Sequence, residues 1–107
     1  MQAPLGEFEA VVLMAVLHLG HEANGSAVLA HIAQRTGRRA SRGSVYVTLD
    51  RLEEKGLLTS RIIDAPSVRG GTKRLFRATA PGIKAVKHAI DTLERMRRGL
   101  DPILGMK

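Results

Sequence analysis

The 107-residue sequence contains no cysteine and no tryptophan, and its only aromatic residues are Phe8, Tyr46 and Phe76. Without cysteine the chain has no disulfide, no thiolate nucleophile and no cysteine-ligated zinc site, and it is compatible with a reducing cytoplasm, where we expect the protein to reside. Recognition of single-stranded nucleic acid usually relies on several stacked aromatic rings. The scarcity of such rings disfavours an RNA-binding domain.

Long apolar runs are also absent. The longest, residues 10–17, is far shorter than the roughly 20 residues that cross a bilayer, and no basic residue precedes it, as a secretory signal requires. The sequence has no P-loop, no dinucleotide-binding fingerprint and no serine-nucleophile motif. We therefore expect no membrane contact, no enzymatic activity and no cofactor.

Positive charge is plentiful but unevenly distributed. The chain has 17 Lys and Arg against 10 Asp and Glu, a net charge of +7. Residues 1–34 contain three acids and no Lys or Arg, whereas residues 35–77 contain 11 basic residues and four acids, a balance of +7. This distribution implies an anionic partner that contacts the middle of the chain.

The spacing of apolar residues predicts two helices in the acidic first part of the chain. Between residues 5 and 19 apolar residues recur every three or four positions, as on the buried face of a helix. The Asn24-Gly25 pair indicates a turn. Ser26 is then expected to cap a second helix, which ends at Gly37.

A third helix is predicted from Ser41, a good N-cap, to Gly56. A projection at 100° per residue places three apolar residues on its inner side: Val45, Leu49 and Leu52. Gly43 and Val47 face away from that side. Polar residues lie on the flanks of the same helix.

Short runs of β-branched and aromatic residues follow, at residues 57–63 and 73–79, and predict a β-hairpin with the basic tip Arg69-Gly70-Gly71. Thr79 is expected to cap a last helix. The predicted fold is mainly α with a small β-hairpin. It consists of a winged helix-turn-helix domain at residues 1–79 and one C-terminal dimerisation helix at residues 80–107.

In a winged helix-turn-helix domain the third helix enters the major groove of DNA, and the hairpin, or wing, contacts the adjacent backbone or minor groove. The basic middle of the chain supplies both elements. The expected contact residues are Ser41, Arg42, Gly43, Ser44, Val47, Thr48 and Arg51 on the helix, and Arg69, Gly70, Gly71, Lys73 and Arg74 on the wing. Ser44 and Thr48 are expected to read bases, and Arg69 to contact the backbone.

The acids Asp50, Glu53 and Glu54 all come late in the third helix. Phosphates repel carboxylates, so DNA contact is expected mainly from the first two turns, where the helix-end N–H groups also favour an anion. We interpret the three acids as a solvated face or as partners of Arg51 and Lys55. They do not form a catalytic carboxylate pair.

The last helix is longer than a three-helix core needs, because residues 83–104 would span about 32 Å at 1.5 Å per residue. Its apolar stripe predicts a homodimer through a short crossed contact shared with the first helix, since Arg97 interrupts the heptad. A two-fold dimer would place two third helices about 34 Å apart and predicts an inverted-repeat operator. The expected dimerisation residues are Leu5, Phe8, Ile83, Val86, Ile90, Leu93, Arg97, Leu100 and Leu104.

Several motifs together resemble one known family. They are residues 5–9 (Leu-Gly-Glu-Phe-Glu), Asn24-Gly25, residues 41–57, Arg69-Gly70-Gly71 with Lys73-Arg74, and residues 79–82. Residues 5–95 thus resemble the PadR family of transcriptional regulators, most specifically at residues 46–56. The resemblance implies a dimeric winged-helix repressor of a palindromic operator, with Tyr46 and its neighbours facing DNA.

Members of this family often respond to small aromatic or cationic compounds, so the resemblance adds a small-molecule inducer, unidentified, to the expected partners: double-stranded DNA and a second copy of the chain. The larger members have a longer helical subdomain where this chain has one trailing helix. In the motif context we expect the Tyr46 hydroxyl to donate to a phosphate, with packing as the alternative.

Two other functions remain open from the residues alone. A winged-helix protein-interaction module could dock an acidic partner on the basic surface, and it would do so without competition from duplex DNA. An RNA-binding domain is the weaker alternative. Competition between duplex DNA and single-stranded RNA separates it from a DNA-binding regulator.

The histidines are the remaining candidate ligands. His18 and His21 lie three residues apart, which could bring two imidazoles to one helix face near Glu22. A metal site needs a further ligand and a supporting shell of hydrogen bonds, and the sequence identifies neither. We therefore expect no bound metal.

Overall fold

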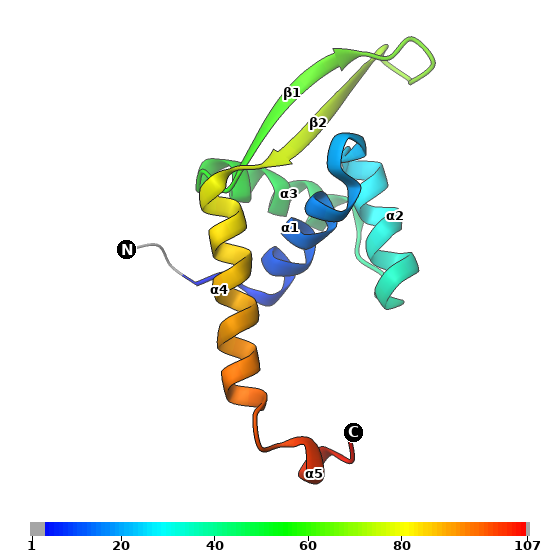
Figure 1. Cartoon of the computed structure of the whole chain (residues 1–107). Helices are drawn as coiled ribbons and strands as arrows, with labels where there is room; N and C mark the ends of the chain where they lie inside the picture. Colours follow the sequence, from blue (N-terminus) through cyan, green and yellow to red (C-terminus); the bar gives the residue numbers. More distant parts are fainter. Residues whose placement is uncertain (1–3, 107) are drawn as a thin grey trace.

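The computed structural model of the protein describes residues 4–106. Its elements are α1 (Glu7–Leu19), η1 (Gly20–Glu22), α2 (Gly25–Thr36), α3 (Arg42–Glu54), β1 (Leu58–Asp64), β2 (Thr72–Ala78), α4 (Ala80–Arg97) and α5 (Asp101–Leu104). The first three helices pack together, the antiparallel hairpin β1–β2 rises from one end of them, and α4 runs down past α1 (Figure 1). This mainly helical fold with one hairpin is the predicted one.

The start of α2 differs from the sequence-based prediction. Asn24, not Ser26, is the N-cap, and its Oδ1 accepts the backbone N–H of Ala27 at 2.8 Å. Asparagine caps a helix as well as serine does, so the first competent residue takes the position. The other end is as predicted, because Gly37 adopts a left-handed conformation with φ +73° and stops the helix.

The predicted caps of α3 and α4 are confirmed. The Ser41 hydroxyl accepts the N–H of Ser44 at 3.0 Å, and the Thr79 hydroxyl accepts the N–H of Gly82 at 3.1 Å. Each cap satisfies a backbone donor that a helix N-terminus leaves unpaired. They fix where α3 begins beside α2 and where α4 leaves the hairpin.

The core lies where α1, α2, α3 and the base of the hairpin meet. Its largest fully buried side chains are Phe76, Leu13, Ile32, Leu49, Leu52 and Leu57. Two backbone contacts attach the hairpin and α4 to this core: the N–H of Phe76 donates to the Ala23 carbonyl at 2.9 Å, and Gly82 packs on the backbone of Leu57. A Cβ at residue 82 would fall within 3.0 Å of the Leu57 carbonyl oxygen, so only glycine allows this approach.

The C-terminal helix is shorter than predicted. Instead of continuing through residue 104, α4 ends at Arg97, Arg98 is extended, Gly99 has φ +86°, and α5 follows as a separate turn. The physical reason is Pro102, whose ring would clash with the carbonyl of Arg98 in a continuous helix. None of the helices within residues 4–106 is long and apolar enough to cross a membrane.

Candidate nucleic-acid interface

Helix α3 has one buried and one exposed face. Val45, Leu49 and Leu52 are completely buried, as predicted. On the opposite face Val47 is 55% exposed, and a Cβ added at Gly43 would meet no atom within 4 Å. The first two turns of α3 therefore present a narrow, unobstructed ridge, the shape that enters a major groove.

The hydroxyl groups of Ser44 and Thr48 form hydrogen bonds within their own helix. The Ser44 hydroxyl donates to the Ser41 carbonyl at 2.9 Å. Thr48 is only 6% exposed, and its hydroxyl donates to the Ser44 carbonyl at 2.7 Å. Thr48 was expected to read bases from a flank of the helix, but that flank is buried here, and its hydroxyl bonds back to the preceding turn, as threonine in helices often does.

Tyr46 lies between the two helices of the helix-turn-helix. Its half-buried ring covers Gly25 at the start of α2, where a Cβ would fall within 3.0 Å of the ring. Packing of this residue is therefore part of how α3 is held against α2. A role of its hydroxyl at phosphate remains a prediction.

The wing tip is a closed turn rather than an open loop. The N–H of Ala65 donates to the Gly71 carbonyl and the N–H of Gly71 to that of Val68, both at 2.8 Å. Gly70 and Gly71 have φ of +90° and +73°, which glycine alone adopts at little cost. This turn presents Arg69 as an exposed cation at the end of the hairpin.

Arg74 does not point into solvent as a simple wing cation would. Its guanidinium donates to Asp50 and Glu53 of α3, both at 2.8 Å, and lies 4.6 Å from the centroid of the Phe76 ring. Burial would lower the pKa of Arg74, but its hydrogen bonds to the two carboxylates raise the pKa above its ordinary value. Arg74 thus ties the wing to α3.

Two more basic residues near α3 pair with acids of α1. Lys55 reaches Glu9 at 2.6 Å, and Arg38 reaches Glu7 at 2.6 Å. Burial would raise the pKa of Glu9, but its bonds to Lys55 and to the N–H of Gly6 outweigh it and lower the pKa. The acids of α3 were interpreted as a solvated face or as partners of Arg51 and Lys55. The structure instead pairs Asp50 and Glu53 with Arg74, because β1 packs on α3 and holds its partner strand β2 within reach of these acids.

The sequence model of the transcriptional regulator PadR-like family matches residues 13–88, most of the chain. The chain belongs to the PadR-like family of transcriptional regulators. This membership makes it a DNA-binding regulator of transcription and not an enzyme. The sequence resemblance to the family is thereby confirmed.

Relatives of this PadR-like regulator agree in sequence and in fold. It is 38% identical over 88 residues to Transcriptional regulator Rv3488 of Mycobacterium tuberculosis, covering 77% of this chain and 78% of the relative. A PadR family transcription regulator from Clostridium difficile R20291 shares the fold with a TM-score of 0.74 at 16% identity, covering 91% and 98% of the two chains. A winged-helix DNA-binding protein from STIV does so with a TM-score of 0.69 at 16% identity and the same coverage.

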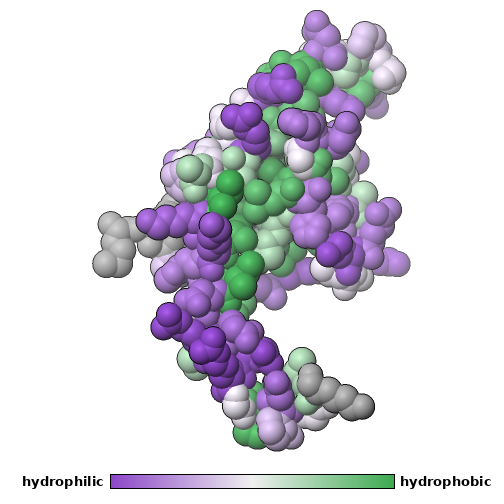
Figure 2. Space-filling view, viewed as in Figure 1, coloured by the Kyte–Doolittle hydropathy of each residue, from purple (hydrophilic) through white to green (hydrophobic). Residues whose placement is uncertain are grey.

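The PadR-like regulator carries exposed apolar residues on α4 and at α5. Of the residues predicted for dimerisation, Ile83, Ile90, Leu93, Leu100 and Leu104 are exposed. Figure 2 shows a band of hydrophobic residues where α4 passes α1. Val86 differs from the prediction, because it is 7% exposed and belongs to the core, and Leu5 and Phe8 pack partly against that core.

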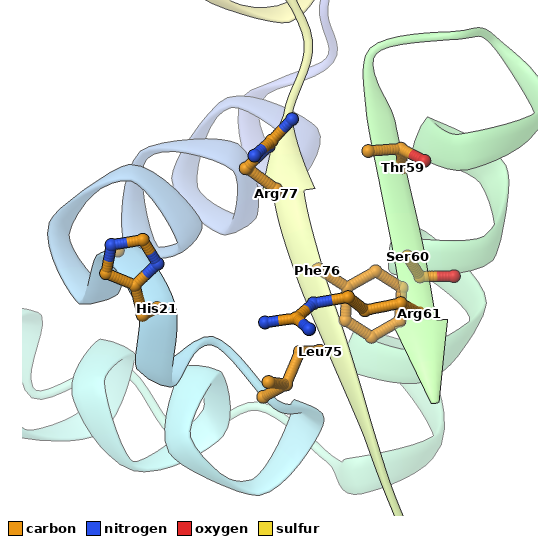
Figure 3. Close-up of a pocket in the computed structure, with 8 residues that line it drawn as sticks. His21, Thr59, Ser60, Arg61, Leu75, Phe76 and Arg77 are labelled. Carbon is orange, nitrogen blue, oxygen red and sulfur yellow. The ribbon is translucent and has the colours of Figure 1, made fainter. Parts of the chain in front are cut away.

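The hairpin of this PadR-like protein has a second basic surface that sequence reasoning missed. His21, Arg61 and Arg77 line a hollow of about 280 Å³ between η1 and the hairpin. In Figure 3, Arg61 extends across β2 toward the side of His21. The alternation of side chains along a strand places Arg61 and Arg77 on the face opposite Arg74. This alternation was the available signal.

The histidines of the PadR-like regulator are not arranged as the sequence suggested. The ring of His18 lies 5.0 Å from that of His31 on α2, whereas His21 belongs to η1 and lines the hollow near the hairpin. Burial, Arg35 and His31 all lower the pKa of His18. Within residues 4–106 no three His, Cys, Asp or Glu side chains are grouped as metal ligands would be.

Proposed function

We propose that this PadR-like regulator is a homodimeric repressor that binds an inverted-repeat operator. The observation that carries the proposal is the division of the surface: α3 and the wing tip offer an exposed groove-sized ridge and a cation, while α4 offers exposed apolar residues elsewhere. A DNA-reading surface and a self-association surface are the two parts that such a protein requires.

The proposed DNA contacts centre on the first two turns of α3. Ser41, Arg42, Gly43, Ser44 and Val47 lie on or beside the exposed ridge, and Arg51 follows one turn later. At the wing, Arg69, Gly70, Gly71 and Lys73 are proposed to approach the neighbouring backbone or minor groove. Arg74 and Thr48 are assigned structural roles in this proposal, because both are bound within the protein.

The proposed dimer interface is the exposed part of α4. Leu93 is 69% and Met96 74% exposed, and two such side chains on one helix favour burial against a partner. Arg97 joins α4 to α5 through ion pairs with Glu94 and Asp101, so it orders the end of the helix beside this face. The two ranges predicted as domains, 1–79 and 80–107, remain a proposal. Their outermost residues, 1–3 and 107, lie outside the described residues.

To test the operator part, the protein is titrated at physiological salt into duplex DNA from the upstream region of its gene and, separately, into random duplex of equal length. We expect protection of two half-sites about one helical turn apart and lower transcription from a reporter when the protein is present. Equal affinity for the random duplex would contradict the proposal. The site of action follows from the partner, so we expect the protein in the cytoplasm.

The dimer part is tested with Leu93→Asp and the matched control His88→Asp, five residues earlier on the other side of α4 and also exposed. We expect Leu93→Asp to sediment as a monomer and to lose binding of the two-half-site operator, and His88→Asp to behave as the parent protein. A dimer that survives Leu93→Asp unchanged would show that another surface associates. An unidentified inducer is tested separately, by screening compounds for release of the operator.

A further inference from the structure

Val47 occupies the centre of the exposed face of α3. The direction opposite the buried residues of this helix passes between Gly43 and Val47, one turn apart. Gly43 contributes no side chain, so the isopropyl group of Val47 is the side chain at the centre of this face, with the longer Arg42 at its edge. Whatever lies at the floor of a groove in front of α3 meets this group first.

Apart from the exposed Arg51, the polar groups beside Val47 are engaged elsewhere. The hydroxyls of Ser44 and Thr48 donate to backbone carbonyls in the preceding turn, and Asp50, one turn further along, accepts from Arg74. The centre of the reading face therefore offers van der Waals contact and few free hydrogen-bonding groups. A base pair in front of it is distinguished by shape and apolar surface.

The major-groove edges of the four bases differ in one apolar group. Adenine, guanine and cytosine present donors and acceptors there, and only thymine presents a methyl group, on C5. A donor or acceptor placed against Val47 would lose its water without gaining a partner, which is unfavourable. A thymine methyl group placed there only has apolar surface removed from contact with water, which is favourable.

We propose that Val47 recognises the 5-methyl group of a thymine at a fixed position in each half-site of the operator. The inference rests on the proposed function, because it requires α3 to enter the major groove. Gly43 allows the approach, because at this position a side chain would separate the helix backbone from the base edges. Val47 thereby acts as a specificity-determining residue.

The test replaces the thymines of the bound site one at a time with deoxyuridine, which lacks only the 5-methyl group. For the parent protein we expect one position per half-site to lose affinity about fourfold, the effect of one buried methyl-sized group. In Val47→Ala that position should become insensitive, and Val47→Thr, which keeps one methyl group, should retain part of the effect.

A gain-of-contact arm uses cytosine at the same position. Replacing it by 5-methylcytosine restores the methyl group and should recover about fourfold in affinity for the parent protein and nothing for Val47→Ala. The matched control is Arg69→Ala, which should weaken binding of every duplex while preserving the response to the methyl group. Circular dichroism and thermal unfolding establish that the variants are folded.

The outcomes separate the two proposals. If no duplex is preferred over random DNA, the proposed function itself fails. If the protein binds its operator specifically but no thymine responds to loss of its methyl group, or Val47→Ala keeps the parent response, the assignment of Val47 is overturned and the operator proposal stands.

Discussion

The ring of Tyr46 covers Gly25 so closely that residue 25 has no room for a side chain. This contact joins the second turn of the reading helix α3 to the first turn of α2, the two helices that must keep a fixed angle for α3 to enter a groove. Tyr46, which the sequence suggests as a DNA contact, thus also packs between α2 and α3 and sets their separation.

Gly25→Ala is predicted to force the Tyr46 ring out of place. Overpacking of this kind destabilises by about 1–3 kcal/mol, which urea denaturation will detect. The matched control is Gly43→Ala on the exposed face of α3, where a Cβ meets no atom within 4 Å. Equal stability of Gly25→Ala and the parent protein would contradict the close packing.

Gly43→Ala itself is predicted to separate stability from binding. Alanine is a better helix former than glycine, so the free energy of unfolding should rise by about 0.5 kcal/mol. Operator affinity should fall, because the added methyl group stands between the helix and the base edges. Unchanged affinity in gel-shift titration would show that α3 does not approach the groove floor at this residue.

The substitution Tyr46→Phe removes only the hydroxyl group and so tests its role in DNA binding. The ring and its packing on Gly25 remain, so thermal stability should change little. If the hydroxyl donates to a phosphate, affinity for all duplexes falls by roughly three- to tenfold, the effect of one hydrogen bond. Affinity equal to that of the parent protein would assign Tyr46 to packing only.

Arg74 and Arg69 both belong to the wing, but we predict that Arg74 contributes to stability and Arg69 to DNA binding. Arg74→Gln removes two ion pairs that are partly exposed, so it should lower the free energy of unfolding by about 1 kcal/mol after allowance for solvent screening. Arg69→Ala should leave stability unchanged and weaken DNA binding. Equal loss of stability in both variants would contradict the structural role of Arg74.

The Glu9–Lys55 pair is predicted to make the free energy of unfolding depend on pH in the acidic range. The pKa of Glu9 is lowered in the folded protein, so the ionised carboxylate stabilises the fold at pH values above its unfolded value of 4.5, and this stabilisation is lost as pH falls through the folded pKa. Glu9→Gln should therefore be less stable than the parent at pH 7, by about 1 kcal/mol, and equal to it in strong acid. Glu22→Gln, on exposed η1, serves as the control. A difference that persists at low pH would assign the effect to another cause.

The regular elements could be predicted from the sequence because their signals are local. The caps Ser41 and Thr79 and the stop at Gly37 depend on a few neighbouring atoms, and the structure confirms them. The C-terminal end of α4 was missed although its cause, Pro102, is also local, because the apolar spacing continues past it.

The placement of site residues was harder to predict because it depends on tertiary contacts. Nothing in the sequence around Arg74 shows that β2 will bring it to Asp50 and Glu53, which lie more than twenty positions away. Thr48 is a similar case, since its exposure depends on how deeply α3 sits in the core. Direction on a helix can be projected from the sequence, but depth and long-range pairing cannot.

The pairing of Arg74 with two carboxylates has a consequence for the salt dependence of DNA binding. Each phosphate neutralised by a free cation releases condensed counterions and contributes about 0.9 to the slope of log affinity against log salt. Arg38, Lys55 and Arg74 are already neutralised by acids of the protein. The slope should therefore be shallower than the 11 basic residues between positions 35 and 77 suggest, and a larger share of the affinity is left to contacts that distinguish one sequence from another.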